Sequence, residues 1–190
     1  MARELEGKVR LARRAFILVP PGGGREVFDD YVLKHRRMAE RNEPSLRFHI
    51  PEPGSPYPSS SLPAQLAQKG VDVHQPRLGD AYEMALFEAF FARSEDVSDP
   101  AVLERAAAGV GIEPETIHAH LRDAEIERQV LQDHREAVES LGITGIPTVV
   151  VPGLAPIVGA VPADFYREAF RAALEGRRLK PPGPARLPTL

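Results

Sequence analysis

The sequence predicts an α/β fold with an inserted helical domain, or an α+β fold. Three observations predict this class: an apolar extended segment close to the N-terminus, about sixty residues of helical periodicity in the middle, and two short apolar runs before a last amphipathic stretch. Strands and helices that are segregated along a chain are typical of these two classes. A length of 190 residues favours one domain with an elaboration.

The N-terminal third predicts a strand, a helix and an irregular loop. Residues 8–19 favour a strand, because apolar and β-branched residues gather towards their end, and "PPGGG" at 20–24 stops it. Residues 25–41 carry an apolar stripe with helical spacing. The piece "LRFHI" at 46–50 suits a short extended segment, and the five prolines in 51–64 indicate an irregular loop.

From Asp80 to about residue 141 the chain is predicted to be helical. Asp99 suits a helix N-cap, and Pro100 then occupies the first helical position, where its missing N–H costs nothing. The longest predicted helix of this block ends at Gly142.

Two apolar runs near the C-terminus predict a β-hairpin. "PTVVV" at 147–151 and "APIVGA" at 155–160 flank the turn "PGLA". An amphipathic helix is predicted over 162–176. The tail at 179–190 is rich in proline and basic residues, and we expect it to be flexible.

The composition bears on several classes of function. A formal net charge of −3, without a basic stripe and interleaved aromatics, gives no indication of nucleic-acid binding. The apolar runs are too short or too broken by proline and glycine to cross a bilayer, and the N-terminus lacks a secretory signal pattern. We expect a cytoplasmic protein with no membrane partner and no cofactor. The chain has no cysteine, which excludes disulfides, thiolate metal sites and thiol nucleophiles.

Six histidines raise the question of a metal site, and their spacing argues against one. His118 and His120 lie two residues apart, and such positions point to different sides of a helix. We therefore expect exposed helical histidines and no metal ligand. The other four histidines are scattered: His35, His49, His74 and His134.

Two further groups of polar residues favour structural roles. Glu125, Glu127 and Asp133 are expected on a solvated helix face, with arginines nearby. The serines at 59–61 suit a helix N-cap better than a nucleophile, because no histidine and aspartate pair accompanies them.

Three stretches of the chain resemble the DsbA family of thioredoxin-fold proteins, and most of all its FrnE-like cytosolic branch. They are "AYEMALFEAFFARSEDVSDPAVLERAAAGVGI", "REAVESLGITGIPTVVV" and "PIVGAVPADFYREAFRAAL". The resemblance implies a discontinuous thioredoxin-like domain, made of residues 1–75 and 142–178. It implies an all-helical insertion at 76–141, and membership of a family of thiol–disulfide oxidoreductases.

The resemblance also implies a substrate-binding loop made of Thr144, Gly145, Ile146 and Pro147. In thioredoxin folds a cis-proline begins a strand of the hairpin, and Pro147 occupies that place. From the residues alone, a trans proline at the start of an edge strand is the alternative. In the cis form the backbone of Ile146 is expected to pair with an extended polypeptide or a glutathione-like thiol.

The chain departs from the family's pattern because the Cys-x-x-Cys motif is absent. The family carries this motif after its first strand, so we expect a fold that is incomplete at the N-terminus, redox-inactive, and without an assigned catalytic residue. Three interpretations stay open: a start assigned too late, a degenerate homologue, or a strand supplied by another chain, which predicts a homodimer. The alternative functions are a non-catalytic peptide-binding or assembly module and a glutathione-dependent isomerase or transferase relative.

Overall fold

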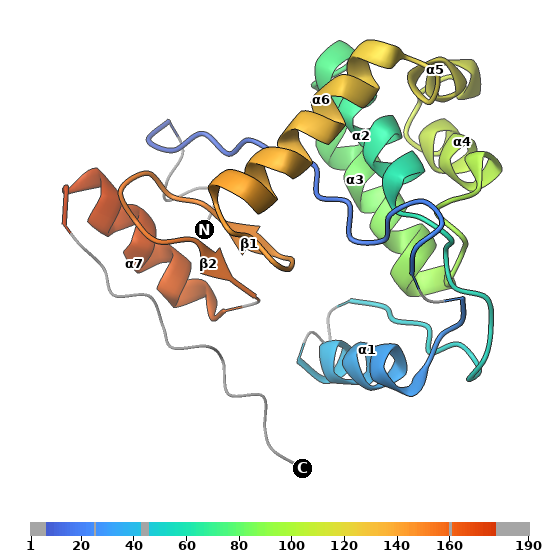
Figure 1. Ribbon diagram of the computed structural model, residues 1–190, viewed down its shortest axis with the longest axis horizontal. Helices are drawn as coiled ribbons and strands as arrows, with labels where there is room; N and C mark the ends of the chain where they lie inside the picture. The colour runs from blue at the N-terminus through green and yellow to red at the C-terminus, as the bar shows by residue number, and fades with distance from the viewer. Residues whose placement is uncertain (1–6, 25, 43–45, 160, 178–190) are drawn as a thin grey trace. The chain divides into compact units, whose positions relative to one another are not determined.

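The computed structural model describes residues 7–24, 26–42, 46–159 and 161–177 (Figure 1). The tail predicted at 179–190 lies outside them. The elements in chain order are α1 (Asp30–Asn42), α2 (Leu62–His74), α3 (Gly79–Phe87), η2 (Glu88–Ala92), α4 (Pro100–Ala108), α5 (Pro114–His120), α6 (Ala124–Arg135), η3 (Glu136–Ser140), β1 (Thr148–Val149), β2 (Ile157–Val158) and α7 (Ala163–Leu174), where η marks a π-helical turn. No helix in the described ranges is both long and apolar enough to cross a membrane.

The chain divides into two compact units, whose bounds differ from the predicted domains. Unit 1 comprises residues 1–14 and 134–190, and unit 2 comprises residues 15–133. The prediction grouped residues 1–75 with the C-terminal hairpin, whereas most of that segment belongs to unit 2. The reason is local packing: Ala15 and Ile17 are buried in one cluster with residues of α2 and α6.

Residues 8–19 and 46–50 do not form the strands that their composition predicts. Both segments run without strand pairing in the described structure. Polar contacts with the start of α2 hold the end of the first segment, since Ser61 Oγ accepts from the Val19 N–H at 3.1 Å and the Ser61 N–H donates to Val19 O at 2.9 Å. Apolar residues at alternate positions therefore serve helix packing here, and the prediction of two strands was wrong.

The core of unit 2 lies between α2, α3, α4 and α5. Tyr82 of α3 is fully buried, and its hydroxyl donates to Leu103 O of α4 at 3.3 Å, so its one polar atom is satisfied. Small buried residues let these helices approach closely, as Ala67, Ala106 and Ala107 show. The predicted N-cap of α4 is confirmed, because Asp99 Oδ1 accepts from the Ala101 N–H at 2.9 Å.

Unit 1 contains the hairpin and the last helix, drawn in orange and red in Figure 1. Strands β1 and β2 pair antiparallel, with Thr148 opposite Val158 and Val149 opposite Ile157. One side of the hairpin packs on α7 through a small apolar cluster made of Val151, Ile157, Ala169 and Phe170. A two-stranded hairpin is marginal in water, so this packing is what stabilises it.

Candidate functional site: the loop before strand β1

The loop at 142–147 is anchored at its start by the π-helical turn η3. The Leu141 N–H donates to Glu136 O at 3.1 Å, and the Ile143 N–H donates to Ala137 O at 2.8 Å. Between them Gly142 has φ +62°, a left-handed conformation that glycine adopts without steric cost. The side chain of Ile143 is buried, so the loop leaves η3 in a fixed direction.

The end of the loop is fixed by two hydrogen bonds. Thr148 Oγ1 donates to Gly145 O at 2.7 Å, and the N–H of Gly159, the residue after β2, donates to Pro147 O at 2.8 Å. The peptide bond between Ile146 and Pro147 is cis. The backbone on both sides of Ile146 is thus held, although Ile146 itself lies outside the two-residue strand.

Ile146 is the most distinctive residue of the loop. Its side chain is 50% exposed, and its backbone N–H and C=O have no hydrogen-bond partner within the described part of the chain. Thr144 and Pro147 are exposed as well, whereas Gly145 is half-buried. The four residues of the predicted substrate-binding loop therefore form one continuous stretch, in which only Gly145 is partly covered.

The loop offers hydrogen bonds and apolar contact, and residues 142–147 include no acidic, basic or thiol side chain. Other exposed apolar side chains of unit 1 lie close by in sequence or across the hairpin, namely Val150 at 46% and Val158 at 53% exposure. Among the described residues no group of three or more histidines and carboxylates could hold a metal ion. What the described residues of this surface offer is backbone hydrogen bonding beside exposed aliphatic side chains.

Two of the histidine and carboxylate predictions were wrong in unit 2. His120 is buried at 5% exposure and stacks on His74, whereas His118 is exposed as expected. Asp133 is also buried, and its Oδ2 accepts from Lys69 Nζ at 2.5 Å and from the Ala15 N–H at 3.1 Å. Helical spacing alone could not reveal these partners, because each comes from an element distant in sequence.

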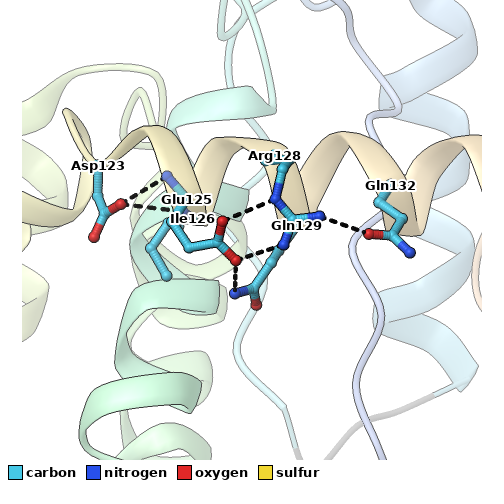
Figure 2. A network of polar contacts seen from close by, with 6 residues as sticks. All are labelled: Asp123, Glu125, Ile126, Arg128, Gln129 and Gln132. Atoms are coloured by element: carbon cyan, nitrogen blue, oxygen red, sulfur yellow. Dashed lines mark hydrogen bonds and ion pairs between the residues drawn. The ribbon is translucent and has the colours of Figure 1, made fainter.

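The prediction of a solvated face is confirmed for Glu125. Figure 2 shows its carboxylate between the side chains of Arg128 and Gln129, with hydrogen bonds of 2.5 to 2.9 Å. The hydrogen bond from Arg128 lowers the pKa of Glu125 to about 2, with a smaller contribution from Gln129. Glu125 and Arg128 are exposed and Gln129 is half-buried, and all three lie on α6, so the network is a set of contacts along one helix.

The serines at 59–61 flank the start of α2 as predicted, although only one of them caps a helical N–H. Ser61 occupies the N-cap position without a side-chain cap bond, since its Oγ accepts from Val19 instead. Ser60 Oγ accepts from the Leu62 N–H at 3.1 Å. The hydrogen-bond partners of the three serine hydroxyls in the described structure are Ser98, Val19 and Leu62.

Unit 2 contains a buried arginine whose burial the sequence did not predict. Arg36 of α1 is 3% exposed, and its guanidinium lies 4.5 Å from the ring centre of Phe90 and 4.8 Å from that of Phe28. The available signal was its position three residues after Leu33, within an apolar helical stripe. A charged residue at such a position indicates a buried polar contact.

Comparison with known protein families shows to which family this chain belongs. The family model of the DSBA-like thioredoxin domain matches residues 46–171, well over half of the chain. The chain belongs to this family. The predicted DsbA-family membership is thereby confirmed, and the matched range includes both the helical segments of unit 2 from α2 onward and the loop with its hairpin.

The chain is similar in fold to a solved structure of another protein, a candidate protein disulfide isomerase from Nitrosomonas europaea. It superposes with a TM-score of 0.63 at 23% identity, covering 82% of this chain and 78% of that chain. The prediction of a thioredoxin-like fold with a helical insertion is therefore confirmed.

The uncharacterized protein YwbO of Bacillus subtilis (strain 168) is a sequence relative, 29% identical over 95 residues. That match covers 48% of this chain and 46% of YwbO, so the chain spans less than half the length of this relative.

Proposed function

We propose that this DsbA-like chain is a binding module that holds an extended polypeptide at Thr144, Gly145, Ile146 and Pro147, and that its 190 residues carry no dithiol chemistry of their own. The observation that carries the proposal is Ile146, whose backbone donor and acceptor lack partners in the described structure while its apolar side chain is half exposed. A FrnE-like relationship is part of the proposal and rests on the sequence resemblance.

The mode of binding that fits this loop is strand addition. An extended peptide that runs beside Ile146 exchanges backbone hydrogen bonds with it. It then continues along the side of β1 that faces away from β2, where no strand pairs with β1 among the described residues. Backbone pairing gives affinity without demanding a particular sequence. Contact with the Ile146 side chain favours apolar residues in the peptide.

Thiol–disulfide exchange is not part of the proposed function, because the chain contains no thiol. Thiol–disulfide exchange needs a thiolate that attacks one sulfur and is released again, and hydroxyl groups cannot pass through a disulfide. The 190 residues contain no cysteine. Binding without exchange is the activity that the described groups can perform.

The test measures binding of fluorescein-labelled apolar peptides by anisotropy. We expect Ile146→Asp to weaken binding at least tenfold, because a carboxylate replaces the apolar contact and repels backbone carbonyls of the peptide. Leu131→Asp is the matched control: it changes an aliphatic residue of similar exposure, 39%, on α6. A peptide with N-methyl groups on alternate backbone nitrogens should bind the wild-type protein more weakly than the unmethylated peptide does, because it cannot donate those backbone hydrogen bonds.

Two outcomes would overturn the proposal. Equal loss of affinity in both variants shows that binding does not depend on the loop, and full binding of the N-methylated peptide shows that no backbone pairing occurs. Displacement of the labelled peptide by glutathione at equal concentration would instead favour a thiol-tripeptide ligand.

A further inference from the structure

A pair of stacked histidines, His74 and His120, lies in unit 2, whereas the loop before β1 belongs to unit 1. His120 ends α5 and His74 ends α2, and their ring centroids lie 5.3 Å apart at an interplanar angle of 23°. His74 is exposed, whereas His120 is 5% exposed. The contact therefore joins the ends of two helices through one buried and one solvated imidazole (α2 and α5 are labelled in Figure 1).

The buried ring has no room to move towards α2. A Cβ added at Gly70 of α2 would lie 2.2 Å from Cγ and 2.3 Å from Nδ1 of His120, so the ring rests against the helix backbone. The Nδ1 atom has no hydrogen-bond partner in the described part of the chain. Because the ring packs against the backbone of α2, it cannot rotate to bring Nδ1 to water when this atom gains a proton.

The surroundings of His120 oppose its protonation on balance. Burial lowers its pKa most, His74 lowers it further, and the carboxylate of Asp123 raises it. Asp123 is the N-cap of α6, and its Oδ1 accepts from the Glu125 N–H at 2.8 Å rather than from His120. On the α4 side, Glu104 pairs with the neighbouring His118 at 3.5 Å.

We propose that the His74–His120 stack is an acid-sensitive contact, and that protonation below about pH 6.5 loosens α5 from α2. The sign follows from the lowered pKa of His120. The opened helix regains an ordinary imidazole that binds a proton in this range, while the packed helix does not, so acid favours opening. Two imidazolium rings at stacking distance also repel each other.

The element that would respond is small. Helix α5 spans seven residues, and packing holds it, since its Ile117 is fully buried in the core shared with α2, α3 and α4. A helix this short is not stable by itself in water. Loss of the contact at its last residue should therefore expose Ile117 while the rest of unit 2 stays folded.

The experiment follows histidine Cε1–H resonances through a pH titration and measures amide exchange over 114–121, corrected for intrinsic rates. In the wild-type protein we expect His120 to titrate below an ordinary imidazole, and protection of 114–121 to fall at least about threefold between neutral and acid pH. His74→Gln removes the repelling ring, so the titration of His120 should move to higher pH. His118→Gln is the matched control on the same helix and should leave both readouts unchanged.

His120→Gln removes the titrating group itself and should abolish the acid-dependent loss of protection. If this variant does not fold, His74→Gln still decides, because His74 is exposed and we expect its replacement to leave the fold intact. An unchanged His120 titration in His74→Gln would overturn the proposal. So would protection of 114–121 that stays constant across the titration in the wild-type protein.

Discussion

At the scale of single residues, Arg36 shows how a buried charge is held by backbone carbonyls and a hydroxyl group. Its Nη1 donates to His49 O and Ser94 Oγ at 2.9 Å each, and its Nη2 donates to Phe90 O at 2.8 Å. Phe90 lies in η2, whose last carbonyls have no partner within the helix, and the negative end of the helix dipole favours a cation there. Burial lowers the pKa of Arg36 to about 10, so the side chain stays charged at neutral pH.

Arg36→Met should destabilise unit 2 by about 3 kcal/mol, because it leaves several partly buried acceptors without a donor and removes the contact of the guanidinium with the aromatic rings. Arg36→Lys should recover only part of the loss, since an ammonium group cannot reproduce the planar fork. Urea denaturation followed by circular dichroism measures both. Arg37→Met, an exposed neighbour on the same helix, is the control, and equal loss in the two methionine variants would contradict this account.

At the scale of elements, one carboxylate ties three distant segments together. Asp133 of α6 binds Lys69 of α2 and the backbone N–H of Ala15, and it has further contacts. Ala15 and Asp133 are also the first and last residues of unit 2. The contact therefore closes the two points at which the chain enters and leaves the unit, and it fixes the segment that was expected to be a strand.

Asp133→Ala should cost about 3–5 kcal/mol of unfolding free energy, because Lys69 is left buried and unpaired with 12% of its side chain exposed. The double variant Lys69→Met with Asp133→Ala should be more stable than Asp133→Ala alone, since the unpaired charge is gone. Glu125→Ala serves as control, and its exposed network should give no measurable change. Additive losses in the double variant would show that the pair is not coupled.

At the scale of the whole molecule, local signals predicted more than long-range ones. The N-cap at Asp99, the hairpin and the last helix depend on neighbours in sequence, and the structure contains all three. The burial of His120 and Asp133 depends on Gly70 and Lys69, which local patterns do not connect to them. For the same reason residues 8–19 matched a strand pattern, although their alternate apolar residues pack on helices.

The site follows the same division. The loop at 144–147 could be located because the resemblance to the family supplied a position for Pro147. The sequence could not predict which backbone groups of this loop lack a hydrogen-bond partner, because that depends on the pairing within the hairpin. Pro147 O accepts from the Gly159 N–H, whereas the backbone N–H and C=O of Ile146 have no partner in the described structure.

The absence of cysteine is a property of all 190 residues, and it gives the last prediction. This chain should not accelerate the reduction of insulin by dithiothreitol, because no side chain can form the mixed disulfide through which the reaction passes. Free thiols should be counted with a chromogenic disulfide, since a chain that binds apolar peptides will delay the precipitation of the released insulin B chain and distort a turbidity assay. A dithiol oxidoreductase in the same buffer supplies the positive control. The chain is expected to slow turbidity while leaving thiol release at the rate of dithiothreitol alone, and Ile146→Asp should remove the delay in turbidity. Thiol release faster than with dithiothreitol alone would contradict a chemistry limited to binding.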